Sequence, residues 1–541
     1  MKKRFLFSLM AGAALTVSAQ GYQDGVDNFN AGRFEEAKII LDNTFGDPST
    51  DKAVSSYYLG CIDMKEGNTA GAKQKFDGGI ASNPKYPLNY VGLGELALKA
   101  GDKKAAEDYF KTALEINKKD TEVMAYVARA YWNADPDKYA NDVQKYIKKA
   151  MKDSKNTEPA VYVLQGDMIG NDPNLASGQY EMAIEQSKER GEINREAYVK
   201  YAQTYFQVPM GRDYAIKRLE EFNERDPQSA LAQRELAEKY YENEQLGRAW
   251  KQYEKYVENP NHFRRDEQRY VGLLYSAEEY EKSVEWANKV LQQDPTIYPM
   301  YRILALNYEK LNKWPEALAA AEKLFNYPNA QLVANDYNIY GEALIQNNRG
   351  ADAVKIYEKI IAENPNDASF MPKLSAAYAA AGENAKSVEV LENYLNAGNG
   401  NLNDLYAMSN RYAALAREHM EDDALRQADA DKAVKYIDMA LEKAPGNPQL
   451  MGVKARLYLV RAKNQLNPQS TAIYEEMLKG LAEDPTRLEK YNSDYKTAYR
   501  NLGAYYASPD YKDNAKAKEY FGKYLEMDPE NQQIREIYDQ L

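Results

Sequence analysis

PLNYVGLGELALKAGDKKAAEDYFKTALEINK, residues Pro87–Lys118, is the stretch of sequence that decides the fold. Its apolar residues recur at helical spacing in two segments, and the turn-forming residues Ala100-Gly101-Asp102 separate them. The stretch therefore predicts two amphipathic helices that pack side by side in opposite directions. Small residues at Gly94 and Ala106 allow the helices to approach closely, and bulky side chains such as Phe110 fill the space around that contact.

This pattern resembles the tetratricopeptide repeat, a unit of about 34 residues with an aromatic, Leu-Gly and Tyr in its first helix and Ala, Phe and a closing Pro in its second. Leu93-Gly94, Ala106 and Phe110 match the family, whereas Ala97 replaces its Tyr and Lys118 its Pro. The resemblance implies an all-α fold in which antiparallel helix pairs stack into a right-handed α-solenoid. It also implies a scaffold that holds partners and carries no chemistry of its own.

The same spacing recurs along nearly the whole chain. Proline lacks an amide donor and disfavours the helical conformation in the residue before it, so a closing proline ends the second helix of a repeat. Five such prolines follow one another at intervals of 33 to 37 residues: Pro227, Pro260, Pro295, Pro328 and Pro365. We count about thirteen repeats in the chain.

The predicted domain organisation has one array, one break and one cap. The register of the repeats loosens over residues 121–190, where we expect irregular repeats and a joint if the array contains one. AGNGNLN, residues 397–403, is rich in Gly and Asn and predicts a flexible linker that acts as a hinge. The boundaries are a signal peptide over 1–19, a repeat array over 20–396, the linker over 397–403, longer repeats with insertions over 404–529, and a capping helix over 530–541.

The first nineteen residues predict export from the cytoplasm. Lys2, Lys3 and Arg4 precede the apolar run Phe5–Val17, and Val17-Ser18-Ala19 fits the small-residue rule for signal cleavage. The alternative is an N-terminal membrane anchor, but the apolar run is short for a membrane span. We therefore expect an exported protein of the bacterial periplasm, free of an integral span after cleavage and able to lie at the periphery of the outer membrane.

Composition and charge exclude some classes of partner. A hydrophobic content of 44% with 28% charged residues is typical of a soluble folded protein. The formal net charge is −12, and removal of the three basic residues of the signal peptide takes it to −15. This acidic balance argues against nucleic acid or an anionic membrane as the main partner.

The sequence contains no pattern that predicts catalysis, a metal or a cofactor. Cys61 is the single cysteine, which excludes an internal disulfide, and we expect it to be a small packing residue. The two histidines, His262 and His419, have no second His or Cys at metal-ligand spacing. No glycine-rich phosphate loop and no nucleophile elbow is present. The prediction is therefore a protein that is not an enzyme and binds no cofactor.

In the tetratricopeptide family, residues of the first helix that flank the packing set line a concave groove, and the resemblance places ten residues there. The lysine and asparagine clamp with which chaperone adaptors of the family hold a terminal carboxylate is absent at the matching positions. Many of the 46 tyrosines fall at the packing position instead and are expected in the core. The expected partner-binding residues are Val91, Glu95, Arg234, Glu238, Tyr241, Tyr275, Arg302, Glu309, Asn338 and Glu342.

The function predicted from these features is a non-catalytic scaffold of the bacterial cell envelope that binds other envelope proteins or peptides on the surfaces of the solenoid. Two alternatives stay open. A glycan- or peptidoglycan-binding module would expose adjacent tyrosines on the concave surface. An accessory subunit of an envelope enzyme complex would depend on its partner for catalysis. The sequence does not distinguish the partner, the pathway, the oligomeric state or the surface used.

Overall fold

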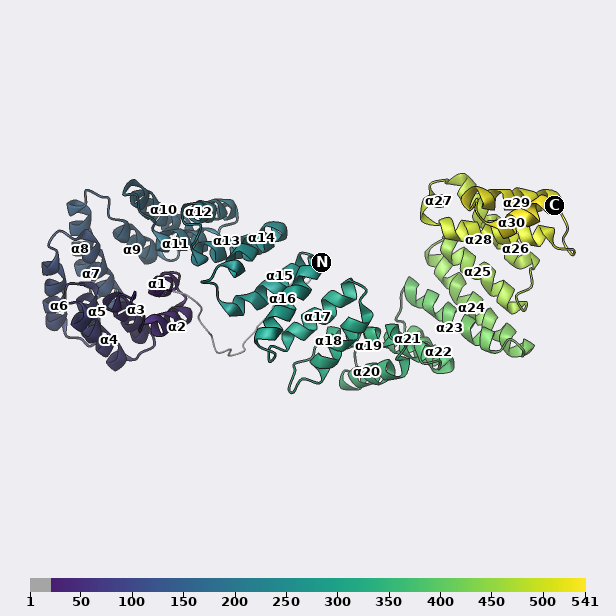
Figure 1. Cartoon of the computed structure of the whole chain (residues 1–541), viewed down its shortest axis with the longest axis horizontal. Helices are drawn as coiled ribbons and strands as arrows, with labels where there is room; N and C mark the ends of the chain where they lie inside the picture. Colours follow the sequence, from purple (N-terminus) through teal and green to yellow (C-terminus); the bar gives the residue numbers. More distant parts are fainter. Residues whose placement is uncertain (1–20) are drawn as a thin grey trace. The chain divides into compact units, whose positions relative to one another are not determined.

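The computed structural model describes residues 21–541, so the predicted signal peptide lies outside the described residues. All regular structure in this range is helical, and consecutive helices pair (Figure 1). Helices α1–α26 form thirteen pairs, and α28 and α29 form a fourteenth. The prediction of an all-α array of stacked helix pairs is confirmed, with one pair more than the approximate count from the sequence.

The chain divides into two compact units, which are described separately: unit 1 ends at Ile303 and unit 2 is Leu304–Leu541. The helices of unit 1 are α1 (Tyr22–Asn30), α2 (Phe34–Thr44), α3 (Lys52–Lys65), α4 (Thr69–Ser82), α5 (Leu88–Lys99), α6 (Lys103–Ile116), α7 (Thr121–Ala134), α8 (Ala140–Asp153), α9 (Pro159–Ile169), α10 (Pro173–Glu189), α11 (Arg195–Tyr205), the 3-10 helix η1 (Pro209–Gly211), α12 (Arg212–Arg225), α13 (Ala230–Glu242), α14 (Leu246–Glu258), α15 (Arg264–Ser276) and α16 (Tyr280–Gln293). The division falls within α17 (Pro299–Lys310).

Unit 2 continues the pairing. Its helices are α18 (Trp314–Phe325), α19 (Ala334–Gln346), α20 (Gly350–Glu363), the 3-10 helix η2 (Ala368–Phe370), α21 (Met371–Ala380), α22 (Asn384–Asn396), α23 (Leu402–Glu418), α24 (Asp423–Lys443), α25 (Pro448–Arg461), α26 (Pro468–Glu483), α27 (Arg487–Lys490), α28 (Asn492–Ala507), α29 (Asn514–Met527) and α30 (Gln532–Gln540).

Local sequence sets where the helices begin and end. Asp51 and Asp102 precede α3 and α6, and their carboxylates accept hydrogen bonds from backbone amides of the first turn. Gly101, between α5 and α6, has φ of +84°, a conformation that glycine adopts at little cost. A cap and a left-handed glycine thus reverse the chain within a few residues, which makes the two helices antiparallel.

Several helix pairs are held together by a small residue that faces a bulky one. Gly94 of α5 lies directly against the Phe110 ring of α6, and Phe110 is completely buried. The absence of a side chain at Gly94 allows the ring to pack against the backbone of the neighbouring helix. Four further pairs make the same contact: Gly60 with Phe76, Gly166 with Tyr180, Gly341 with Tyr357, and Gly503 with Phe521.

Tyrosines at the packing position fix one repeat to the next. The hydroxyl of Tyr240 donates to a carboxylate oxygen of Glu220, twenty residues earlier, at 2.6 Å. Tyr378 donates to Glu358 at 2.6 Å with the same separation along the chain. The rings are buried while the hydroxyls reach the edge of the core, where a polar partner is available. Tyr412 repeats the contact with Glu392 at 3.0 Å.

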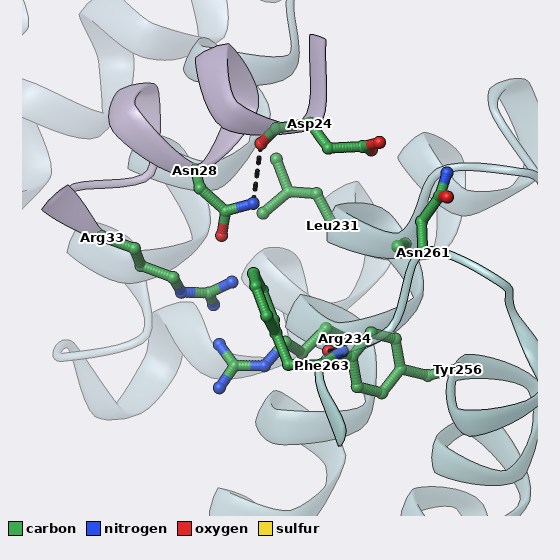
Figure 2. Close-up of a pocket in the computed structure, with 9 residues that line it drawn as sticks. Asp24, Asn28, Arg33, Leu231, Arg234, Tyr256, Asn261 and Phe263 are labelled. Carbon is green, nitrogen blue, oxygen red and sulfur yellow. Dashed lines mark hydrogen bonds between the residues drawn. The ribbon is translucent and has the colours of Figure 1, made fainter. Parts of the chain in front are cut away.

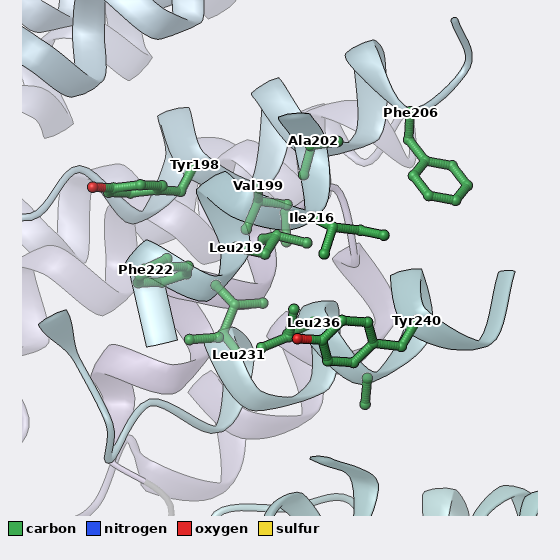
Figure 3. Packing of buried hydrophobic residues seen from close by; sticks show 14 of the residues in the cluster. Tyr198, Val199, Ala202, Phe206, Ile216, Leu219, Phe222, Leu231, Leu236 and Tyr240 are labelled. Carbon is green, nitrogen blue, oxygen red and sulfur yellow. The ribbon is translucent and has the colours of Figure 1, made fainter. Parts of the chain in front are cut away.

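In unit 1 the array returns on itself. Helix α1 packs against α3 and also contacts α11 and α13, which lie about 170 and about 200 residues further along the chain (Figure 1). The apolar core around α11–α13 contains Tyr198, Phe222 and Leu236 (Figure 3), and Ala31, at the end of α1, joins the same cluster. The first helix pair therefore lies against the first helices of later repeats.

The two segments that the sequence marks as irregular differ in structure: the first consists of helix pairs, and the second connects two helices. Residues 121–190 form the pairs α7–α8 and α9–α10. At 397–403, Gly398 and Gly400 have positive φ, and Leu391 of α22 shares an apolar cluster with Leu405 of α23. A hinge at this position stays a prediction. At the C-terminal end, α30 buries Ile534 against the cluster that contains Phe521.

The glycine contact gives a prediction with a matched control. A Cβ atom at Gly94 would overlap the Phe110 ring, so Gly94→Ala should lower the free energy of unfolding of unit 1 by about 1–3 kcal/mol. Gly78 is also helical, but a Cβ there meets no atom within 4 Å, so Gly78→Ala should raise stability by roughly 0.5–1 kcal/mol. Urea unfolding followed by circular dichroism measures both. Equal effects of the two substitutions would contradict the packing account.

Candidate interaction site

The expected partner-binding residues of unit 1 differ in their accessibility. Val91 is buried, with 2% of its surface exposed, and Glu95 accepts a hydrogen bond from Asn133 at 3.2 Å. Burial raises the pKa of Glu95. Tyr275 is half-buried, with its ring 5.8 Å from that of Tyr280, and Arg302 is half-buried on α17.

Three of the expected residues come together on α13. Arg234 donates to Asp266 at 2.6 Å, and Glu238 pairs with Arg269 at 2.5 Å, so both residues connect α13 to α15. The guanidinium group of Arg269 also lies over the ring of Tyr241, 5.3 Å from its centre. Tyr241 is exposed at 37%. This group presents an aromatic ring and charges of both signs to the solvent.

In unit 2 the three remaining residues are half-buried. Glu309 forms an ion pair with Lys310 at 3.7 Å, and Glu342 accepts from Gln346 at 2.7 Å. The backbone oxygen of Asn338 accepts from Tyr357 at 3.3 Å. Burial lowers the pKa of Lys373, although the nearby carboxylates of Glu342 and Glu309 act in the opposite direction. The role of these ten residues in partner binding stays a prediction.

A ladder of ion pairs, which the sequence analysis did not find, joins the first helices of the irregular repeats. Arg129 of α7 and Lys200 of α11 each contact Asp167 of α9 at 2.7 Å, and Lys200 also contacts Glu196 at 2.9 Å. Burial pushes the pKa of Asp167 upward, but the two cations outweigh it and hold the pKa below its usual value. The ladder satisfies the charges of this face within the protein.

A signal for the ladder was present in the sequence. Glu95 directly follows the small residue Gly94, and Arg129 and Asp167 follow Ala128 and Gly166 in the same way. The irregular spacing of the repeats over 121–190 hides this correspondence. The register of the first helices is nevertheless maintained, since insertions between helices leave the packing within each helix unchanged.

The N-terminal helix pair docks on α11, α13 and α15 through charged groups. Arg33, in the turn between α1 and α2, forms an ion pair with Glu235 of α13. Glu36 of α2 forms one with Arg265 of α15. Arg195 of α11 lies 3.7 Å from Asp27. Gln203 of α11 also donates to the backbone oxygen of Ala31 at 3.4 Å. Nothing in the local sequence pattern indicates these contacts, because their partners are far apart along the chain.

Burial and neighbouring charges shift the pKa values of ionisable groups in the docked helix pair. Burial raises the pKa of Asp27 to about 6, although Arg195 partly offsets this effect. Burial and the positive charge of Arg234 lower the pKa of Arg33 to about 10. Figure 2 shows the guanidinium groups of Arg33 and Arg234 near one another, at a small gap that Phe263 also lines.

Beside this contact, unit 1 has a polar pocket with a volume of about 270 Å³. We call it the α13 pocket. Four cations and three carboxylates line it, so neither sign of charge dominates. Most of them take part in ion pairs along its walls, as between Lys239 and Glu242 at 2.8 Å. The lining residues are Arg33, Gln203, Arg234, Glu235, Glu238, Lys239, Glu242 and Arg269.

Other chemical possibilities find no support in the described part of the chain. Over residues 21–541, no group of three or more His, Cys, Asp or Glu side chains could hold a metal ion. His262 contacts Glu267 at 2.9 Å and His419 contacts Asp429 at 2.8 Å. Burial raises the pKa of the Cys61 thiol, which keeps it protonated. Among the described helices, none is both long and apolar enough to cross a membrane.

Comparison with solved structures gives distant similarities. The C-terminal part of a TPR repeat-containing protein from Cytophaga hutchinsonii has 18% identity and a TM-score of 0.40, over 50% of this chain and 98% of that chain. A human IFIT1 dimer with m7Gppp-AAAA has 14% identity and a TM-score of 0.31, over 87% of this chain and 96% of that chain.

Comparison with curated proteins gives a distant bacterial relative. Cellulose synthase operon protein C of Pseudomonas fluorescens (strain SBW25) is 27% identical over 193 residues, which are 34% of this chain. The match spans 14% of that protein.

Family models locate the repeats themselves. Residues 63–134, in unit 1, and residues 304–368, in unit 2, match models described as tetratricopeptide repeat. These segments include the Gly94–Phe110 and Gly341–Tyr357 contacts that hold their helix pairs together. Both units thus contain a segment that matches a model of this repeat.

Proposed function

We propose that the protein is a non-catalytic scaffold of the bacterial cell envelope and that it binds a protein partner at the α13 pocket. The observation that carries this proposal is the presence of Arg234 and Glu238 in the lining of one accessible pocket of unit 1, with the exposed Tyr241 beside the lining residue Arg269. These three residues were expected to bind a partner from their offset in the repeat alone.

The chemistry of the pocket favours a peptide or protein surface. Arg and Tyr are the side chains most enriched at the centres of protein interfaces, because they combine contact area with directional hydrogen bonds. The α13 pocket has Arg269 in its lining, together with carboxylates such as Glu242, and the ring of Tyr241 lies beside the Arg269 guanidinium group. A partner with mixed charges would find complementary groups there for both signs of its charge.

The envelope location rests on two supports. The first nineteen residues have the pattern of a cleaved signal peptide. The distant relative is encoded, by its name, in a cellulose synthase operon. That name also supports a second candidate function, an accessory subunit of an envelope enzyme complex, in which the tetratricopeptide array would hold the enzyme and contribute no catalytic residue of its own.

The glycan-binding alternative expects neighbouring exposed tyrosines on one concave surface. In the described part of the chain the exposed tyrosines are Tyr214, Tyr241 and Tyr511. Tyr214 lies on α12, Tyr241 on α13 and Tyr511 in the loop between α28 and α29. Their separation on different elements does not favour a sugar platform, so we prefer a protein partner.

In-cell photocrosslinking tests the proposed site. A photoreactive residue at Tyr241 should capture one or two envelope proteins, identified by mass spectrometry, because this exposed side chain lies beside Arg269 of the α13 pocket. Tyr214 is the matched control, since it is an exposed tyrosine of the same unit whose ring lies beside Lys217, which does not line the pocket. Arg269→Gln should reduce the yield of the product at Tyr241 severalfold, by removing the cation beside the ring. The same proteins captured at both positions, or none at Tyr241, would contradict the proposal.

A further inference from the structure

The N-terminal helix pair covers part of the surface that lines the α13 pocket. Arg33 pairs with Glu235, and Gln203 bonds to the backbone of Ala31, so the docked pair engages two lining residues and contributes a third. A partner that used the whole surface of α11, α13 and α15 would have to take the place of α1 and α2. The strength of the docking contact therefore determines how accessible this surface is to a partner.

The docking contact is mainly polar. Its three ion pairs join Arg33, Asp27 and Glu36 to residues of α11, α13 and α15. Among the residues of the turn and the end of α1, Ala31 alone belongs to the buried apolar cluster around α11–α13. A contact in which charged pairs predominate contributes less apolar burial than the stacking of one repeat on the next.

Several polar groups at the contact are buried, lack a hydrogen-bond partner or face a like charge. The Asn28 Oδ1 atom is buried and has no hydrogen-bond partner in the described part of the chain. The like charges of Arg33 and Arg234 face one another (Figure 2). Asp27 is buried at 6% exposure. Each of these groups would be better solvated if the pair separated, and an unpaired buried polar atom opposes docking.

We propose that the α1–α2 pair is a displaceable internal ligand of the α11–α15 surface, and that the protein partner displaces it. The partner is a helical segment with the charge order of α1–α2, which presents a basic group to Glu235 and an acidic group to Arg265. This inference rests on the proposed protein-binding function and adds its regulation, because the protein binds fully only after its own N-terminal repeat has been released.

Hydrogen exchange of the full chain, followed by mass spectrometry, tests displacement without a partner. In the wild type, residues 22–44 should exchange much faster than the core of α11–α14, through opening of the contact. Glu36→Gln and Glu235→Gln should each accelerate exchange in 22–44 by on the order of tenfold, since each leaves a cation unpaired. Glu35→Gln is the matched control, because the neighbouring Glu35 is exposed and forms no ion pair with α15. Exchange of 22–44 only together with α11–α14, in every variant, would overturn the proposal.

The acidity of Asp27 gives an independent check. Its carboxyl faces Asp24 on α1, Arg195 on α11 and Asp226 after α12, and the pKa is about 6 in the docked state against 3.8 ordinarily. A raised pKa means that the docked state binds the proton more tightly, so docking gains strength as the pH falls through 6. From about pH 7 to about pH 5, exchange of 22–44, corrected for its intrinsic rate, should slow by about tenfold. Asp27→Asn should remove most of this change, and the remainder comes from Asp24, whose pKa burial also raises. Faster corrected exchange at low pH would contradict the account.

Capture at Tyr241 separates this inference from the proposed function. If both hold, Glu36→Gln should increase the yield of the crosslinked partner severalfold over the wild type, and Glu35→Gln should not. Capture that is equal in Glu36→Gln and wild type would overturn displacement while leaving the binding site intact. The absence of capture in every variant would overturn the proposed function, and with it the partner assigned here.

Discussion

The contact between a small residue on one helix and a bulky residue on the next is the interaction on which the rest of the structure depends. Gly94 and Phe110 show it in its simplest form, with the ring packed directly on the backbone of the paired helix. Because each pair forms from neighbouring sequence, the array is assembled from local contacts, and tyrosines such as Tyr240 then fix one pair to the next. A repeat array therefore tolerates insertions between its helices, but it leaves exposed edges at its two ends.

The two ends are covered in different ways. At the C-terminus, α30 buries Ile534 on the last pair and serves as a local cap. At the N-terminus, the edge of the first pair lies on α11 and α13, in the same unit. The first helices of later repeats are thus used, in part, to cover the array's own first repeat. The α13 pocket lies beside that contact, since Glu235, which forms an ion pair with Arg33, also lines the pocket.

The contacts between residues close together in the chain could be predicted from the sequence. Helix pairs, their loops and the packing of Gly94 follow from the spacing of small and bulky residues, which depends on neighbours within about 34 residues. The same offset placed Arg234, Glu238 and Tyr241 on one face of α13. It could not show that Val91 is buried, nor that Arg33 and Glu36 meet α13 and α15, because those facts depend on the curvature of unit 1. Curvature is the sum of small rotations over many repeats, and no single residue specifies it.

The measurement that tests the central claim most directly is a zero-length crosslink across the docking contact in the full chain. Arg265→Lys keeps the positive charge opposite Glu36 and provides an amine that a carbodiimide can join to a contacting carboxylate. The account predicts an amide between Lys introduced at 265 and Glu36, without one at the adjacent Glu35, and its loss in urea. No product at Glu36 under native conditions, with the protein folded, would show that the N-terminal helix pair does not dock on α15.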